Sequence, residues 1–304
     1  AIPDRSRLQR GQTPQAFRLS VISEAYKRAF NDPDLKVTDD CGVVVKYMHE
    51  VPVHLVAGEE SNMKLTYKED TFLLDKLFQL RGSQAPDVPG KEHFGGRVAV
   101  VFGGSYGIGK DIATELRNAG AKVYSFSRSL TGTDVGNRRD VARALKEVAD
   151  KEGKIDYVIN TAGVLNKEPL CSMDSSIIQA AVQTNYMGTV NVALEAYNYL
   201  KQTQGQLVFF TSSSYTRGRA FYSIYSSTKA AIVNFVQAIA QEWESVGIRV
   251  NCINPERTKT PMRVKNFGVE PDDTLLKSEV VADATVRCLM ADYTGQVIDV
   301  KRQG

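Results

Sequence analysis

The sequence predicts an α/β fold built around a doubly wound parallel sheet. Two observations indicate this fold. From residue 97 onward, short apolar segments alternate with amphipathic segments, and repeated βα units form a parallel sheet that helices cover on both faces. A glycine-rich loop, VVFGGSYGIGK, joins the first strand to the first helix, at the kind of turn where such sheets bind their ligands.

The individual elements follow from hydrophobic patterning and stop signals. Apolar runs predict strands at residues 97–104, 121–127, 155–163, 205–214, 248–255 and 295–300. Amphipathic segments predict helices at residues 110–120, 141–153, 177–200 and 227–247. The first of these helices ends at Gly120, and glycine is a common helix stop.

Residues 83–96, SQAPDVPGKEHFGG, divide the chain into two parts. This segment has two prolines and three glycines among polar residues, which is typical of a linker. We therefore expect one domain at residues 1–82 and a second at residues 97–304. A chain of 304 residues is long enough for two domains.

The composition excludes several classes of protein. A net charge of +3 without a long basic tract argues against nucleic acid or a membrane surface as partner. No apolar run is long enough for a membrane span, and the charged start AIPDRSRLQR is not a signal peptide. Cys41, Cys171, Cys252 and Cys288 form no C-x-x-C pair, so we expect no metal site and a reducing, cytoplasmic location.

The glycine loop predicts a dinucleotide site. Gly103, Gly107 and Gly109 let the backbone approach a pyrophosphate, and the following helix N-terminus favours its negative charge. Their spacing is G-x-x-x-G-x-G, so the prediction depends on the strand–turn–helix context. The second strand ends at Ser127 and Arg128, where NAD-binding chains have an acidic residue. An arginine there suits the 2′-phosphate of NADP, although a solvated arginine is the alternative.

The segment YSIYSSTK, residues 222–229, places Tyr225 four residues before Lys229 at the start of a predicted helix. Residues at this spacing share a helix face, and such pairs are common on protein surfaces. The alternative is chemical, because a neighbouring cation lowers the pKa of a phenol. The pair alone leaves both interpretations open. The three histidines lie at or before residue 93, so acid–base chemistry in the second domain would need another group.

Residues 97–300 resemble the short-chain dehydrogenase/reductase family, whose fold is of the Rossmann type. The matching motifs, in chain order, are the glycine loop, Asp134-Val135, NTAG at 160–163, Asn185 in TNYMG, Ser212 at 13 residues before Tyr225, NPERTKTPM at 254–262 and TGQVIDV at 294–300. Three departures concern the nicotinamide pocket and its closure. Phe102 stands where the family often has threonine, Glu256 stands where it has glycine, and the segment between Met262 and Leu275 is short for a substrate lid.

The resemblance implies a carbonyl reductase. Tyr225 would protonate the carbonyl oxygen, and Lys229 would lower the pKa of Tyr225 and hold the nicotinamide ribose. Ser212, or Ser213 as the alternative, would bind the carbonyl, and Asn185 would anchor a water leading to Lys229. The residues implied to bind NADPH are Gly103, Ser105, Tyr106, Gly107, Ile108, Gly109, Ser127, Arg128, Asp134, Val135, Asn160, Ala162, Gly163, Tyr225, Lys229, Pro255, Thr258 and Thr260.

Residues 1–80 resemble the C-terminal part of the cytidylyltransferases that couple CTP to sugar or polyol phosphates, through RGQTPQAF, VTDD and VHLVAGEESNMKLTYKEDTFLLDKLF. By motif position, the resemblance implies that Arg5, Thr13, Thr38 and Lys64 surround the polyol phosphate or CTP. The family's glycine-rich, basic CTP loop does not occur before residue 97. We therefore expect a partial α/β cytidylyltransferase domain, with CTP and Mg²⁺ used only by a complete domain.

A cytidylyltransferase joined to a reductase implies consecutive reactions. We expect NADPH-dependent reduction of ribulose 5-phosphate to ribitol 5-phosphate, followed in the complete protein by CDP-ribitol synthesis for capsule or teichoic-acid-type polymers. The candidates for binding the phosphate are Lys167, Arg217, Arg219 and Arg257, and we favour Arg217 and Arg219 because a glycine between them permits a tight turn.

The sequence also leads to an expectation about assembly and leaves two alternative functions open. Both resemblances imply a homodimer or a larger homo-oligomer. One alternative is a reductase that acts on another carbonyl, such as a 3-oxoacyl thioester. The other is a non-catalytic scaffold whose first part serves only to dimerise.

Overall fold

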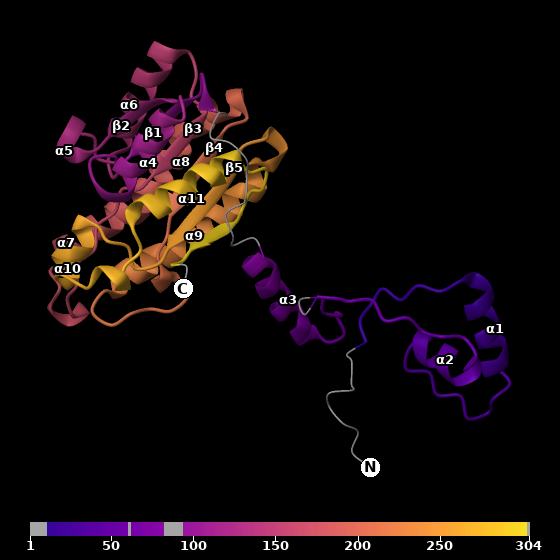
Figure 1. Cartoon of the computed structure of the whole chain (residues 1–304). Coiled ribbons are helices and arrows are strands. Elements are labelled where there is room, and N and C mark those ends of the chain that lie inside the picture. The colour runs from indigo at the N-terminus through magenta and orange to yellow at the C-terminus, as the bar shows by residue number, and fades with distance from the viewer. Residues whose placement is uncertain (1–10, 60–61, 82–93, 303–304) are drawn as a thin grey trace. The chain divides into compact units, whose positions relative to one another are not determined.

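The structure, a computed structural model, describes residues 11–59, 62–81 and 94–302. The chain divides into two compact units, Ala1–Phe78 and Gln79–Gly304 (Figure 1). Each unit has its own hydrophobic core and is described separately.

The second unit contains the parallel sheet that the sequence predicts. Among the described residues, six strands pair in the order β2-β1-β3-β4-β5-β6, and every neighbouring pair is parallel. The chain adds β2 on one side of β1 and all later strands on the other, so the strand order reverses between β1 and β3. The strands are β1 (Val98–Phe102), β2 (Lys122–Phe126), β3 (Tyr157–Asn160), β4 (Gln206–Phe210), β5 (Arg249–Pro255) and β6 (Val297–Val300).

Helices cover both faces of this sheet, as a doubly wound fold requires (Figure 1). Along β1, Val98 and Val100 face one helical layer, while Ala99 and Val101 face the other. The first layer consists of α6 (Arg138–Glu152), α8 (Gly188–Thr203) and α9 (Ser223–Trp243), and the second consists of α4 (Gly107–Asn118) and α11 (Ser278–Met290).

Helix α11 is absent from the sequence-based prediction. It packs lengthwise against α4 and buries Val281, Ala284, Thr285 and Cys288, which recur at helical spacing. Small and polar residues at these positions make its apolar stripe weak. Its place is set by the sheet face that it covers.

The predicted helix at residues 177–200 is interrupted. The structure has α7 (Ser175–Val182), then a π-helical segment, η4 (Gln183–Met187), and then α8. A π-helical turn inserts an extra residue and turns side chains away from their regular positions, often at functional sites. Asn185 lies within this turn and is 1% exposed.

Short elements complete the second unit. Helix α10 follows β5, and its N-cap is Thr260, whose side chain accepts a hydrogen bond from the Arg263 backbone at 3.2 Å. The short elements are α5 (Arg128–Thr131), η3 (Leu170–Ser172), η5 (Ser213–Tyr215), η6 (Glu244–Val246), α10 (Pro261–Phe267) and η7 (Asp272–Thr274).

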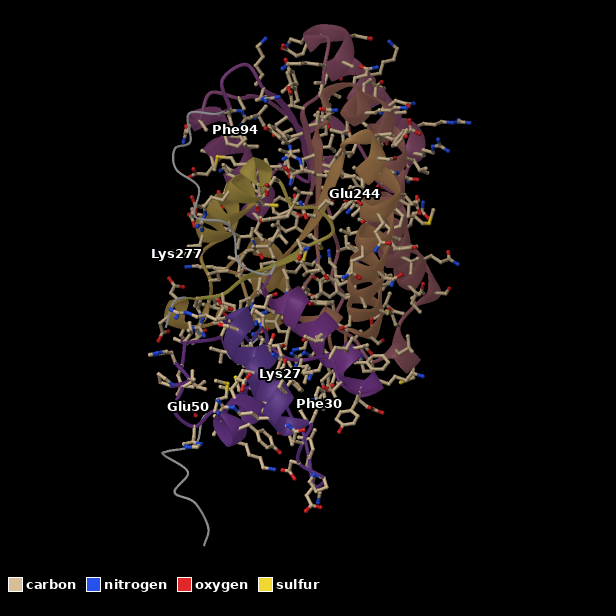
Figure 2. The ribbon with its side chains drawn as sticks, turned by 90° about the vertical axis from the view of Figure 1, so that its right-hand side faces the viewer. Lys27, Phe30, Glu50, Phe94, Glu244 and Lys277 are labelled. Carbon is tan, nitrogen blue, oxygen red and sulfur yellow. The ribbon has the colours of Figure 1, made fainter. Side chains whose placement is uncertain are left out.

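Phe94 lies within the predicted linker at residues 83–96 but belongs to the packed second unit. Its ring is fully buried and meets the ring of Tyr157 edge-on, with 5.6 Å between centroids (Figure 2). The packed part of this unit therefore includes residue 94, before the predicted domain start at residue 97. The rest of the predicted linker, residues 83–93, lies outside the described residues.

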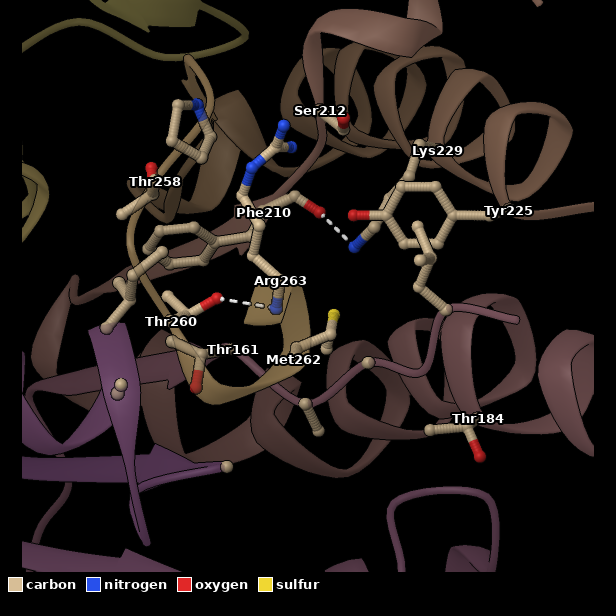
Figure 3. A pocket seen from close by; sticks show the side chains of 18 of the residues that line it. Thr161, Thr184, Phe210, Ser212, Tyr225, Lys229, Thr258, Thr260, Met262 and Arg263 are labelled. Carbon is tan, nitrogen blue, oxygen red and sulfur yellow. Dashed lines mark hydrogen bonds between the residues drawn. The ribbon is translucent and has the colours of Figure 1, made fainter. Parts of the chain in front are cut away.

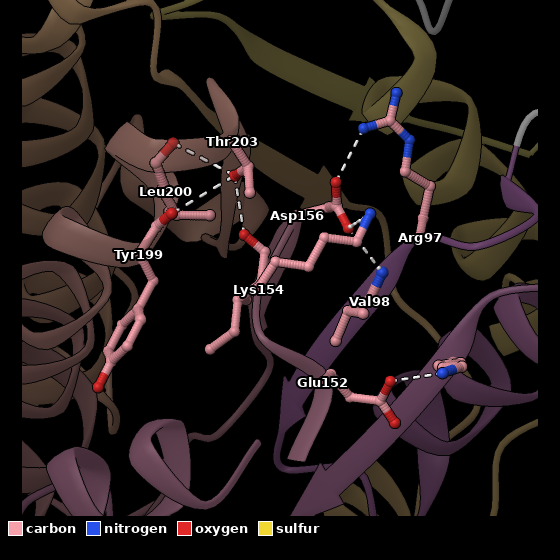
Figure 4. A network of polar contacts seen from close by, with 10 residues as sticks. Arg97, Val98, Glu152, Lys154, Asp156, Tyr199, Leu200 and Thr203 are labelled. Atoms are coloured by element: carbon pink, nitrogen blue, oxygen red, sulfur yellow. Dashed lines mark hydrogen bonds and ion pairs between the residues drawn. The ribbon is translucent and has the colours of Figure 1, made fainter. Parts of the chain in front are cut away.

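Asp156 links neighbouring segments at the amino-terminal edge of the sheet (Figure 4). Its carboxylate accepts hydrogen bonds from Arg97 Nη1 and from the Val98 backbone, both at 2.8 Å, and pairs with Lys154 Nζ at 3.0 Å. Burial alone would raise the pKa of Asp156, but these donors hold it below its ordinary value. The opposite edge, at the carboxyl ends of the strands, is where sheets of this kind bind ligands.

The first unit is small and helical in its described residues. It contains α1 (Leu19–Ala29), α2 (Asp40–Tyr47) and most of α3 (Lys68–Arg81), and residues 11–59 and 62–81 include no strand. Its core is Ala25, Ala29, Val43, Val44 and Met48. The α/β character expected of this unit does not extend to these residues, because a strand needs a hydrogen-bonded neighbour and none is present among them.

Membrane-spanning helices and metal-binding clusters are both absent from the described residues. None of their helices is long and apolar enough to cross a membrane. Within the same residues, no group of three or more His, Cys, Asp or Glu side chains is placed to hold a metal ion.

Candidate active site

A cavity of about 690 Å³ lies at the carboxyl ends of the strands (Figure 3). Its wall includes the residue that follows each of β1 to β4, and the last residue of β5: Gly103, Ser127, Thr161, Thr211 and Pro255. In open α/β sheets, ligands bind at this edge, near the point where the strand order reverses. The volume is in the range of cofactor and small-molecule sites.

The glycine loop is too closely packed for larger residues. At Gly103, φ is +81°, and a Cβ would lie 2.6 Å from Thr161 Oγ1. A Cβ at Gly109 would collide with the carbonyl oxygen of Gly103. The loop leads directly into α4, whose N-terminus at Gly107 faces the cavity. This arrangement fits a pyrophosphate, because bare backbone and a helix N-terminus stabilise its charge.

The cavity continues to Arg128 and Asp134. Arg128 Nη1 lies 4.0 Å from Asp134 Oδ2, and the Arg128 side chain is 60% exposed. Ser127 Oγ caps α5 by accepting a hydrogen bond from the Leu130 backbone at 3.1 Å. Arg128 is thus held loosely and can contact an anion at this end of the cavity.

Tyr225 and Lys229 point into the cavity from one face of α9 (Figure 3). Lys229 Nζ lies 5.6 Å from the centroid of the Tyr225 ring and donates a hydrogen bond to the Phe210 carbonyl at 2.8 Å. Lys229 is 5% exposed. The geometry therefore does not fit the alternative interpretation as a solvated surface pair.

The expected lowering of the Tyr225 pKa by Lys229 is not found. Burial raises the pKa of Tyr225 to about 12, and a hydrogen bond with the Ser212 hydroxyl lowers it only in part. Burial also lowers the pKa of Lys229 to about 8, and its ammonium bonds to Phe210 rather than to the phenol. Desolvation dominates both groups. The phenol is consequently protonated at neutral pH, which is the state that a proton donor needs.

Of the two serines expected to bind the carbonyl, Ser212 and Ser213, Ser212 contacts Tyr225. Both serines line the cavity, but Ser212 is the one whose hydroxyl hydrogen bonds with the phenol. The Ser214 hydroxyl donates to Ser212 Oγ at 3.3 Å and helps to orient it. These contacts favour Ser212 as the carbonyl ligand.

Asn185 does not line the cavity but supports it. Its Oδ1 accepts a hydrogen bond from the Val164 backbone at 2.8 Å, and its Nδ2 donates to the Val164 carbonyl at 2.9 Å. The backbone of Gly163 lies between Asn185 and Lys229, since a Cβ there would be 3.4 Å from Asn185 Oδ1 and 3.7 Å from Lys229 Nζ. The π-helical turn thus fixes the loop after β3 beside Lys229.

The cavity brings together most of the residues expected to bind the cofactor. Asn160 is the exception: it is buried behind the wall, where its Oδ1 accepts from the Ala162 backbone at 3.1 Å. The expected residues that line the cavity are Gly103, Ser105, Tyr106, Gly107, Ile108, Gly109, Ser127, Arg128, Asp134, Val135, Ala162, Gly163, Tyr225, Lys229, Pro255, Thr258 and Thr260.

The basic residues expected to bind phosphate are divided. Arg219 and Arg257 line the cavity, whereas Arg217 and Lys167 do not. Lys167 is an exposed residue whose Nζ lies 4.8 Å from the centroid of the Phe267 ring. The favoured pair, Arg217 and Arg219, is thus not brought to the cavity as a pair.

Sequence reasoning missed a cavity residue on α10. Arg263 lines the cavity and follows directly after the recognised segment NPERTKTPM. Phe267, one helical turn further on, also lines it. Their spacing of four residues on one helix face was the available signal.

Thr38 and Lys64, two of the candidates in the first unit, lie near Asp39 at the start of α2. The Thr13 carbonyl accepts from Asn62 Nδ2 at 2.8 Å, and Thr38 precedes the N-cap Asp39. The charge of Lys64 acts on Asp39 and helps to hold its pKa below the ordinary value, after the larger effects of the Gln15 and Gly42 hydrogen bonds. Arg5 lies outside the described residues.

Comparison with known proteins identifies both parts of the chain. The family described as short chain dehydrogenase matches residues 97–269, and the family described as 2-C-methyl-D-erythritol 4-phosphate cytidylyltransferase matches residues 1–79. These matches confirm the two resemblances noted from the sequence.

Two curated relatives show the same division. The bifunctional ribulose 5-phosphate reductase/CDP-ribitol pyrophosphorylase Bcs1 of Haemophilus influenzae is 47% identical over 98% of this chain and 64% of its own length. The 2-C-methyl-D-erythritol 4-phosphate cytidylyltransferase of Thermobifida fusca is 53% identical over 26% of this chain and 32% of its own length. The chain thus spans less than two thirds of either relative.

A solved structure shows the same fold as the second unit. The 3-ketoacyl-(acyl-carrier-protein) reductase of Brucella melitensis, complexed with NADH, covers 68% of this chain and 97% of its own, with a TM-score of 0.63 and 22% identity. This likeness confirms the predicted fold.

Proposed function

Because the chain belongs to the short chain dehydrogenase family, we propose that it reduces ribulose 5-phosphate to ribitol 5-phosphate with NADPH. The observation that carries the choice of substrate is the 47% identity with the Haemophilus enzyme, which runs through both parts of the chain. In the complete protein, the cytidylyltransferase part would then transfer the CMP group of CTP to the phosphate of ribitol 5-phosphate, with Mg²⁺, forming CDP-ribitol and releasing pyrophosphate. The product would serve capsule or teichoic-acid-type polymers.

The residues of the cavity fit the reduction. Bound NADPH would supply a hydride, with its electron pair, to the carbonyl carbon. The Tyr225 hydroxyl donates its proton to the carbonyl oxygen, so that the C=O bond becomes an alcohol. The Ser212 hydroxyl hydrogen bonds to the same oxygen and holds it near Tyr225. Lys229 holds the nicotinamide ribose with its ammonium, and Asn185 positions the loop beside it.

The other parts of the cavity would hold the rest of the cofactor. The glycine loop and the N-terminus of α4 bind the pyrophosphate, and Ser127 and Arg128 bind the 2′-phosphate. Asp134 and Val135 contact the adenine. Convergence of Ser212, Tyr225 and Lys229 in one cavity argues against a non-catalytic scaffold.

A substrate comparison tests the proposal. The purified chain should oxidise NADPH in the presence of ribulose 5-phosphate, with the absorbance of NADPH as readout. Turnover with unphosphorylated ribulose or a 3-oxoacyl thioester should be at least 10-fold less efficient in kcat/KM, because a lost charged contact has about that effect. Equal or better use of the thioester would point to the alternative reductase instead.

Arg128→Ala is expected to raise the KM for NADPH about 10-fold or more, with little change in the KM for NADH. The reason is that only NADPH has a 2′-phosphate for the guanidinium, and a hydrogen bond to a charged group contributes about 1.5–3 kcal/mol. Steady-state kinetics with both cofactors measures this. Equal changes for the two cofactors would remove Arg128 from this role.

The chain is also expected to form at least a homodimer, since both families commonly associate. The first unit leaves large apolar side chains exposed, including Leu55 at 80%, Val56 at 91% and Phe72 at 75%. Light scattering at micromolar protein should give at least twice the chain mass of 33.5 kDa. A monomer at that concentration would contradict the expectation.

A further inference from the structure

Arg263 is a half-buried cation in the cavity wall for which the proposed reaction has no task yet. It lies on α10, and its side chain extends into the cavity (Figure 3). Its Nε donates to Glu270 Oε2 at 2.6 Å and its Nη2 donates to Glu270 Oε1 at 2.9 Å. The Arg263 side chain is 17% exposed, so this two-point pair is shielded from solvent. A shielded guanidinium binds anions more strongly than an exposed one.

The charges of two further cations act on the same carboxylate. Lys167 Nζ lies 4.8 Å from the centroid of the Phe267 ring, and Arg263 Cζ lies 4.4 Å from it. Arg257 lines the cavity as well. The hydrogen bonds from Arg263, followed by the charges of Arg263, Arg257 and Lys167, hold the pKa of Glu270 below its ordinary value. Glu270 therefore pairs directly with Arg263, and the charges of Arg257 and Lys167 also act on it.

We propose that Arg263, with Arg257 and Lys167, forms the subsite for the substrate phosphate, and that Glu270 is the internal counterion with which this phosphate competes. The inference rests on the proposed function, because it places one group of the proposed substrate. A guanidinium presents the same planar pair of donors to a carboxylate and to a phosphate. Glu270 thus occupies the donors that a phosphate dianion would use.

The position of the cluster suits a ketose phosphate. Such a substrate has its carbonyl on C2 and its phosphate on C5, so the phosphate must lie in the same cavity as Tyr225 but away from it. Tyr222 connects the two places, since its ring meets Tyr225 at 6.4 Å and Phe267 at 5.9 Å between centroids. Arg263 packs on the far side of this aromatic row, against Phe267.

Arg219 is the rival location within the cavity. Arg219 lines the wall, but it is an exposed residue, as are Arg257 and Lys167, so Arg263 is the shielded cation among these four. Arg217 beside Arg219 is outside the lining. Solvent weakens the attraction between an exposed guanidinium and an anion. We therefore expect Arg263 to contribute more than Arg219 to phosphate binding.

The decisive experiment compares Arg263→Met with Glu270→Gln. In the NADPH-bound enzyme, Arg263→Met should raise the KM for ribulose 5-phosphate about 10-fold or more, with unphosphorylated ribulose used as by the wild type. Glu270→Gln should lower that KM severalfold, because the competing charge is gone. If the Arg263–Glu270 pair only stabilises α10, both variants would raise the KM for ribulose 5-phosphate. This result would overturn the proposal.

Three further variants test whether the change in KM is specific to Arg263. Lys265→Ala removes a positive charge from the same helix outside the cavity wall and should leave the KM unchanged. Arg263→Lys keeps the charge but loses the two-point contact, so its KM should lie between those of the wild type and Arg263→Met. A larger rise for Arg219→Ala than for Arg263→Met would place the phosphate at Arg219 and overturn the proposal.

Inorganic phosphate separates this inference from the proposed function. Failure of the wild type to reduce ribulose 5-phosphate would reject the proposed function. The subsite is tested by isothermal titration of the NADPH-bound protein with inorganic phosphate. Binding that weakens about 10-fold in Arg263→Met and tightens in Glu270→Gln supports the subsite, and binding that is absent or unchanged in both overturns it.

Discussion

Tyr225→Phe is expected to lower kcat by about 10²-fold or more, the scale of a missing general acid. The substitution removes the hydroxyl and keeps the ring, so the packing with Tyr222 should survive. NADPH should bind as in the wild type, because the glycine loop and Arg128 are untouched. No histidine follows residue 93 that could supply the proton instead. Steady-state kinetics, with titration of NADPH fluorescence, measures both quantities.

Tyr222→Phe is the matched control for this prediction. Tyr222 lines the same cavity, and its ring contacts both Tyr225 and Phe267. Its hydroxyl has no assigned task, and Ser226 rather than a cation lies four residues after it. Most activity should therefore remain. An active Tyr225→Phe enzyme, or an inactive Tyr222→Phe enzyme, would reject the assignment of the proton donor.

Lys229→Met is expected to lower kcat by about 10²-fold and to weaken NADPH binding, because Lys229 holds the nicotinamide ribose in the proposed reaction. The same substitution should change the pH dependence of stability. Burial lowers the pKa of Lys229 to about 8 from 10.5, so the folded chain releases the Lys229 proton at lower pH than the unfolded chain does. Burying the charged form of Lys229 lowers the free energy of unfolding by about 3 kcal/mol below pH 8. This loss disappears as the pH rises to about 10.5.

The measurement is the difference in unfolding free energy between Lys229→Met and the wild type. This difference should favour the variant most near pH 7 and should decrease by about 3 kcal/mol between pH 8 and 10.5. Trp243, the single tryptophan of the chain, lies on α9 with Lys229 and reports urea unfolding of this unit. The raised pKa values of Tyr225 and Cys252 affect both proteins and largely cancel. A pH-independent difference would mean that Lys229 has an ordinary pKa.

Much of the second unit could be predicted from local patterns. The strands at β1, β3 and β4 are apolar runs, and the glycine loop precedes a helix of clear period. Helix α11 was missed because its buried face is made of small and polar residues. The π-helical turn at Asn185 was missed because the hydrophobic pattern continues through it. Both features depend on contacts with distant parts of the chain.

The proposed catalytic residues were likewise only partly predictable from the sequence. Spacing pointed to Tyr225 and Lys229, and the order of the motifs pointed to Ser212 and Asn185. Spacing does not report burial, however, and the expectation that Lys229 lowers the pKa of Tyr225 was wrong for that reason. Desolvation in the cavity wall outweighs the attraction between the two groups.

The sequence by itself determined the order of βα units and the glycine loop, and it indicated the short chain dehydrogenase family that the comparison confirms. These features depend on neighbours within a few residues, which a pattern reports directly. Only the tertiary structure brought the charge of Lys167 to the same carboxylate as those of Arg257 and Arg263. Lys167 follows β3, whereas Arg257 and Arg263 follow β5, yet the charges of all three act on Glu270. The physical reason is that parallel strands end at one edge of the sheet, so that loops distant in sequence become electrostatic neighbours.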